Sequence, residues 1–157
     1  MDEYHCCSAT LRVVANDLDP DIVTTALGWP PDQTWRRGER KRFMRADGTE
    51  RVFDSVHDAG GWARFGLADE RASPLQDQVA AWLNRLRGKG PALQRLRDRG
   101  CEVELDCFAA TSEYLHLPVA LLAELATLGV DLAVTFSAGG NLSAAEPLGA
   151  PDRGGGK

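Results

Sequence analysis

Alternation of apolar and polar residues is clearest in two segments of the chain. In Ser8–Ala15, apolar residues occupy every second position from Ala9, and in Cys101–Phe108 they alternate with three carboxylates. Side chains of a strand point in turn to the two faces of a sheet, so each pattern predicts a strand with one buried face. We expect the two strands to pair antiparallel, with Arg12 opposite the carboxylates of the second strand.

Two further segments repeat one helical pattern. Asp19–Pro31 and Leu117–Gly129 each follow an alternating stretch, carry a proline at the start of an apolar helical stripe, and reach Leu-Gly at its end. Proline is tolerated in the first turn of a helix, and glycine suits the left-handed residue that closes one. The repeat therefore predicts two short helices, the first capped by Asp19.

The remaining elements follow from the same periodicities. Ser73 and Gln76 predict a capping box before a helix that breaks at Gly88–Pro91, and Ala92–Arg99 predicts a second helical piece. Four further strands are predicted: Lys41–Arg45 and Glu50–Asp54, which form a hairpin around Asp47-Gly48, then Trp62–Leu67 and Asp131–Ser137.

These elements run in the order β-α-β-β-β-α-β-α-β. The order predicts an α+β domain over residues 1–137: a ferredoxin-like antiparallel sheet with helices on one face, extended by a C-terminal helix-strand unit. Residues 138–157 hold few large apolar side chains, and we interpret them as a disordered tail.

Composition narrows the class of protein. Apolar residues make up 43% of the chain and charged residues 26%, as in an ordinary globular domain. No apolar run is long enough for a membrane helix, and the acidic start is unlike a secretory signal. The four cysteines form no C-x-x-C pair. We therefore expect a cytoplasmic protein with free thiols and no membrane partner.

Candidate metal and catalytic residues lack the spacing that such chemistry requires. Adjacent strand residues such as Cys6 and Cys7 point in opposite directions, while Cys101 and Cys107 fall on an apolar face. The histidines are isolated in sequence, and no nucleophile elbow, zinc-protease or phosphate-loop motif is present. We therefore predict no metal, no cofactor and no catalytic residue, and we lean away from an enzyme.

Charge is divided along the chain. Residues 36–51 carry a net charge of +4 and residues 85–99 a net charge of +5, which leaves −14 for the rest of a chain with a net charge of −5. Cations at the end of a helix are favoured by its dipole, which accounts for the second cluster. The first cluster lies on the predicted hairpin, where alternating residues cannot all face one core.

We therefore predict a partner-binding hairpin that meets an acidic protein surface. The basic residues that we expect to contact the partner are Arg36, Arg37, Arg40, Lys41, Arg42, Arg45 and Arg51. Two alternatives stay open: RNA or a small anion bound at this hairpin, and an enzyme without a recognisable motif. Nucleic acid is disfavoured, because the strand that should carry base-stacking aromatic residues carries three carboxylates instead.

The order of motifs resembles a bacterial family known as domain of unknown function 4279. The matching residues are Leu11–Val14, Asp19-Pro20, Ile22, Leu27-Gly28, Pro31, Arg37-Gly38-Glu39, Gly61-Trp62 and Leu128–Leu132, and they span about residues 8–136. The resemblance supports the fold but implies no activity. Together with the absence of catalytic motifs, it leads us to expect an accessory or immunity-like protein-binding module. The arginine-rich segment before Arg45 departs from the family pattern.

Overall fold

The computed structural model describes residues 7–44, 48–67, 73–109 and 115–136. Its strands are β1 (Cys7–Ala15), β2 (Gln33–Trp35), β3 (Arg40–Met44), β4 (Glu50–Val56), β5 (Gly60–Phe65), β6 (Glu102–Ala109) and β7 (Asp131–Phe136). Its helices are α1 (Pro20–Leu27), α2 (Leu75–Leu86), α3 (Gly90–Asp98) and α4 (Val119–Leu128), with a 3-10 turn, η2 (Arg87–Lys89), joining α2 to α3. The predicted tail, residues 138–157, lies outside the described part of the chain.

The fold is α+β, with a five-stranded mixed sheet and a separate two-stranded hairpin. The sheet has the order β2-β5-β1-β6-β7, and β3 pairs only with β4. β1 pairs antiparallel with both β5 and β6, β2 pairs antiparallel with β5, and β7 is parallel to β6. The predicted pairing of the first strand with Cys101–Phe108 is confirmed. The sheet is mixed because β7, the strand of the C-terminal helix-strand unit, is parallel to β6. A crossover helix separates β6 from β7, and such a connection makes consecutive strands parallel.

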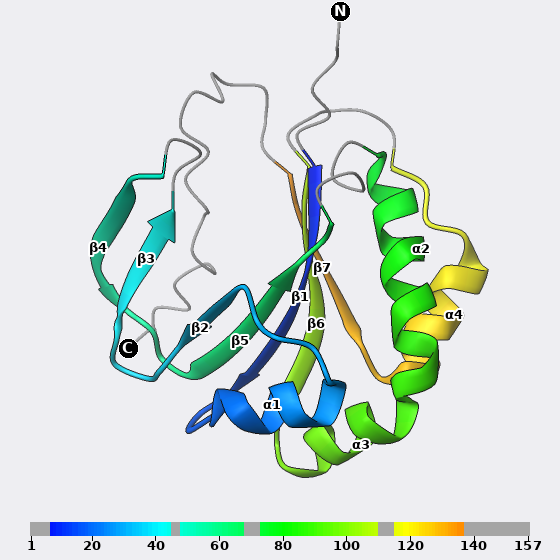
Figure 1. The fold of residues 1–157 in the computed structure, drawn as a ribbon. Coiled ribbons are helices and arrows are strands. Elements are labelled where there is room, and N and C mark those ends of the chain that lie inside the picture. The colour runs from blue at the N-terminus through cyan, green and yellow to red at the C-terminus, as the bar shows by residue number, and fades with distance from the viewer. Residues whose placement is uncertain (1–6, 45–47, 68–72, 110–114, 137–157) are drawn as a thin grey trace, which may run out of the picture.

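The helices cover one face of this sheet (Figure 1). Alternate residues of β1 and β6, including Leu11 and Leu105, are fully buried and join a core with Trp62, Trp82 and Leu93. The opposite face carries the other alternate residues, and we call it the open face. The β3–β4 hairpin extends away from the helices (Figure 1).

The repeated helical pattern folds as its sequence predicts. Asp19 accepts a hydrogen bond from the backbone N–H of Asp21, and Pro20 occupies the first turn of α1. Gly28 and Gly129 close α1 and α4 with φ values of 75° and 67°, the left-handed conformation in which glycine has no Cβ penalty. The repeat therefore serves the architecture, since each copy delivers the chain from a strand into a helix on the same face.

The start of α2 differs from the predicted capping box. The helix begins at Leu75 after Pro74, and no side chain caps it. Gln78 anchors this end instead: its Oε1 accepts from the N–H of Ala9 at 3.1 Å, and its Nε2 donates to the carbonyl oxygen of Ser73 at 2.9 Å. A buried amide is costly unless it is hydrogen-bonded, and these bonds tie α2 to β1.

Candidate protein-binding surface

The basic arm is the segment Arg36–Val56, which contains the β3–β4 hairpin. Arg42 lies opposite Val52 in its antiparallel register. Gly48 has a φ of 84°, in the left-handed region that the Asp47-Gly48 pair predicts for a tight turn. The predicted hairpin is confirmed, although it forms its own sheet.

Hydrogen bonds between described residues close the base of the arm and join the arm to β2. The N–H of Gly38 donates to the carbonyl oxygen of His57, and the N–H of His57 donates to that of Glu39, both at 2.8 Å. Gln33 of β2 donates from its Nε2 to the carbonyl oxygen of Arg42 at 3.4 Å. The rest of the hairpin therefore projects from the domain with its edges unpaired by the main sheet.

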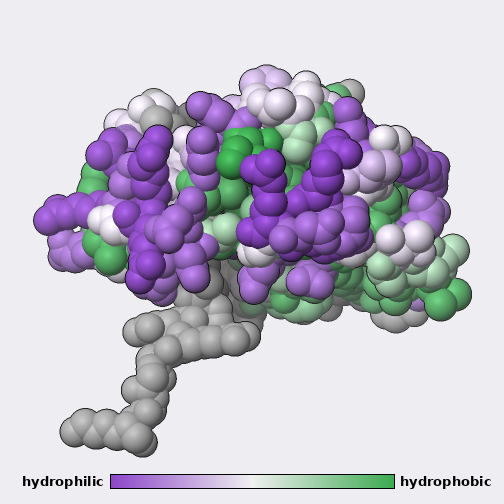
Figure 2. Space-filling model, turned by 90° about the horizontal axis from the view of Figure 1, so that it is seen from below, coloured by the Kyte–Doolittle hydropathy of each residue, from purple (hydrophilic) through white to green (hydrophobic). Residues whose placement is uncertain are grey.

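Basic side chains lie on the outside of this arm. The exposed members of the predicted set are Arg36, Arg37, Arg40 and Arg42. Lys41 and Arg51 are partly buried, and Arg45 lies outside the described residues. Hydrophilic surface gathers at the left of Figure 2, where the arm lies in Figure 1.

Among the described residues, the ion pair of Arg42 on the arm is a weak one. Arg42 Nη1 lies 3.6 Å from Glu50 Oε1, and the Arg42 side chain is 63% exposed. Such an exposed pair contributes about 0–1 kcal/mol. The Arg51 guanidinium lies 4.9 Å from the centroid of the Phe53 ring. Arg37, Arg40 and Lys41 form no ion pair with any residue that the structure describes, so their charge remains available to a partner.

A row of stacked side chains connects the arm to the open face. The rings of Trp35 and His57 stack with centroids 5.0 Å apart and planes 21° apart. The Arg12 guanidinium also lies 5.5 Å from the centroid of the Trp35 ring. Burial lowers the pKa of His57, and the positive charges of Lys41 and Arg12 lower it further.

The open face becomes acidic beyond Arg12. Arg12 Nη1 lies 3.2 Å from Glu104 Oε1 and 3.5 Å from Asp106 Oδ2, as predicted from the strand pattern. Burial raises the pKa of Glu104, while Arg12 opposes this rise. The open face therefore runs from a basic arm, through Arg12, to a row of carboxylates on β6.

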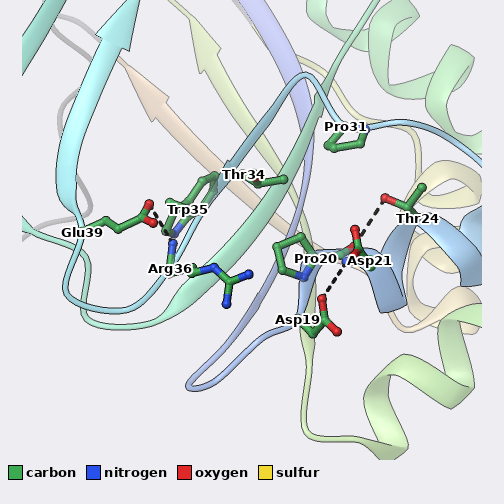
Figure 3. A pocket seen from close by; sticks show the side chains of 9 residues that line it. All are labelled: Asp19, Pro20, Asp21, Thr24, Pro31, Thr34, Trp35, Arg36 and Glu39. Carbon is green, nitrogen blue, oxygen red and sulfur yellow. Dashed lines mark hydrogen bonds between the residues drawn. The ribbon is translucent and has the colours of Figure 1, made fainter.

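A hollow of about 340 Å³ lies where the arm meets α1 (Figure 3). Its lining residues are Asp19, Pro20, Asp21, Thr24, Pro31, Thr34, Trp35, Arg36 and Glu39. Two of its carboxylates already accept local hydrogen bonds: Asp19 caps α1, and Glu39 accepts from the N–H of Arg36 at 3.1 Å. Asp19 and Glu39 therefore help to order the chain around the hollow.

Metal and thiol chemistry have little support in the described residues. Among them, no group of three histidine, cysteine or acidic side chains could hold a metal ion. Cys101 and Cys107 are buried on the helix-covered face, and burial raises the pKa of Cys107 to about 12. A thiol in this state is a poor nucleophile. His5 and Cys6 lie outside the described part of the chain.

Sequence reasoning missed β2 and the stacking that it brings about. Trp35 is buried, yet it lies on the open face beside Gly61, outside the main core. The alternation of Gln33, Thr34 and Trp35 was a weak signal for this strand, because three residues cannot establish a period.

These features define a small α+β domain with a projecting basic hairpin. The chain belongs to the family described as domain of unknown function (DUF4279), whose model matches residues 2–138. No curated protein and no solved structure matches the chain. No helix among the described residues is long and apolar enough to cross a membrane.

Proposed function

We propose that this domain is a non-enzymatic protein-binding module, of an accessory or immunity-like kind, that docks an acidic protein surface on its basic arm. The observation that carries the proposal is the separation of the β3–β4 hairpin from the main sheet. Its exposed arginines have no structural task in the core and few charge partners within the described residues. Arginine favours interfaces, because its planar guanidinium pairs with carboxylates through two hydrogen bonds.

The proposed scaffold is a ferredoxin-like core. The order β2-β5-β1-β6, with every neighbouring pair antiparallel, supports it, and α4 and β7 are then an extension at one edge. The arm is inserted between β2 and β5, and Trp35 and His57 hold its base against the sheet. A partner therefore meets a hairpin whose base is fixed, which lowers the entropy lost on binding.

Opposite charge on the two surfaces mainly accelerates association. The test begins with affinity capture from cells that express the full chain, followed by purification of the captured partner. Association is then measured with wild-type protein and with the double variant Arg40→Glu/Arg42→Glu. We expect the association rate to fall about tenfold or more at low salt and the effect to shrink as salt is added.

A matched control reverses the charge of two arginines in the other basic cluster, residues 85–99. Arg95 and Arg99 are exposed on and just after α3, so the control variant is Arg95→Glu/Arg99→Glu. We expect this control to bind almost as the wild type does. Equal losses in both variants, or no loss in the arm variant, would contradict the proposal. Arm-dependent binding of a uridine-rich RNA oligomer but not of polyglutamate would favour the RNA alternative.

A further inference from the structure

Among the described strands, β7 forms one edge of the sheet, and its side chains are mostly apolar. It pairs with β6 on one side and with no described strand on the other. Exposed edges are normally protected by lysine, proline, a bulge or a very short strand. Asp131 is the only charged residue among the six of β7, Asp131–Phe136, which contain no lysine, proline or bulge, and Phe136 is 53% exposed. This edge can therefore accept another strand.

α4 presents an apolar stripe beside this edge. Val119 is 81% exposed and Leu122 is 42% exposed, and Ala123 and Ala126 are also exposed. These four residues stand at positions i, i+3, i+4 and i+7, so they lie along one side of the helix. Apolar surface is seen at the lower right of Figure 2, on the side where α4 lies in Figure 1.

The stripe lies on the flank of α4 that points away from α2. The other flank carries Glu124, whose two carboxylate oxygens accept from Arg87 at 2.9 and 3.1 Å. At 3.6 residues per turn, Leu122 and Glu124 lie about 160° apart around the helix. α4 also contacts β7. The open strand edge and the apolar stripe therefore belong to the same side of the domain.

We propose that this side, made by β7 and α4, is the interface of a symmetric homodimer. The β7 strands of two copies pair antiparallel about a two-fold axis perpendicular to the sheet, which keeps both helix layers on the same side. α4 connects β6 to β7 and contacts β7, and in this arrangement it lies over that pair of strands. The two α4 helices are then separated by two strand spacings, about 10 Å, which is within the normal range for packed helices.

Charge identifies a second copy as the occupant. Residues 115–136 contain no lysine or arginine and only two carboxylates, Glu124 and Asp131, and Glu124 is paired with Arg87. A strongly charged partner would find no complement in this segment, whereas two copies can bring its nearly uncharged residues together without a like-charge pair at their centre. An axis through Ala133 places Asp131 opposite Thr135 of the partner subunit, so the two copies of Asp131 do not face each other.

Sedimentation equilibrium of the full chain tests the proposal at about 1–100 µM, the range of ordinary reversible association. We expect a dimer for the wild type. Leu122→Glu should weaken dimerisation about tenfold or more, because it buries a carboxylate without a partner. Val56→Glu is the matched control, since Val56 is 47% exposed on the basic arm. This control should dimerise as the wild type does.

A charge exchange separates loss of the interface from loss of folding. Ala133→Lys and Ala133→Glu each place like charges together at the two-fold axis, so each variant alone should be monomeric. An equimolar mixture of the two should restore a dimer. A wild type that stays monomeric over the whole concentration range overturns the proposal, even if another molecule or segment covers the edge of β7. A Leu122→Glu variant with unchanged mass, or a mixture that stays monomeric, overturns it as well.

Discussion

The indole of Trp35 lies against Gly61, in the space that a side chain at position 61 would occupy. The two residues are register partners on β2 and β5, and both face the open side of the sheet. Because Arg12 and His57 both pack on the indole, the absence of a side chain at Gly61 sets where the basic arm begins.

Substitution Gly61→Ala should therefore displace Trp35 and loosen the base of the arm. A methyl group at this position would overlap the indole, and overpacking of this kind costs about 1–3 kcal/mol. Urea unfolding measures the loss of stability, and tryptophan fluorescence reports the displacement. Gly88→Ala is the control, since no atom lies within 4 Å of its added methyl group. Equal stability of both variants would show that the indole adapts without cost.

Arg12 and Glu104 should shape the dependence of stability on pH. Burial raises the pKa of Glu104, so the folded state favours its protonated form, and stability is lost as pH rises above the ordinary carboxylate value of about 4.3. Glu104→Gln should flatten this decline in urea unfolding midpoints measured from pH 4 to pH 7. Arg12→Gln should steepen it, because the opposing positive charge is removed. Identical profiles in both variants and the wild type would contradict this account.

His57 should have the opposite effect on the pH profile. Its pKa is lowered by burial and by nearby cations, so the folded state favours the neutral ring. The stability that it contributes is present above its ordinary pKa of about 6.5 and is lost as pH falls through the folded value. His57→Phe keeps a ring on Trp35 and should reduce the loss measured between pH 7 and pH 5. His116→Phe should lose stability between pH 7 and pH 5 as the wild type does. If both variants lose the same amount of stability over this range, His57 is not the source of the loss.

Removal of residues 138–157 should leave the folded domain almost unchanged. The segment lies outside the described residues, and Leu142 and Leu148 are its only large apolar side chains. A chain that ends at Ser137 should keep its thermal midpoint within about 2–4 °C of the full chain, the shift that about 1 kcal/mol produces. Calorimetry measures this, and loss of a cooperative transition would show that the segment packs on the domain.

Local patterns in the chain were sufficient for most of the elements. The period-two patterns of β1 and β6 specify which side chains are buried, and a one-residue slip would expose all of them. Asp19, Pro20 and Gly28 define α1 through backbone preferences that require no distant partner. The contact between Arg12 and Glu104 could also be predicted, because it requires only that β1 and β6, with their alternating patterns, pair with each other.

Only the tertiary structure decided what depends on contacts between distant segments. Gln78 anchors α2 to β1 through bonds across 69 residues or more, which no local pattern indicates. The separation of the arm from the main sheet depends on which edge β2 fills, and the stacking of Trp35 on His57 depends on that edge and on Gly61. Hydrophobic periodicity specifies which face of an element is buried, but the choice of neighbours is made by packing.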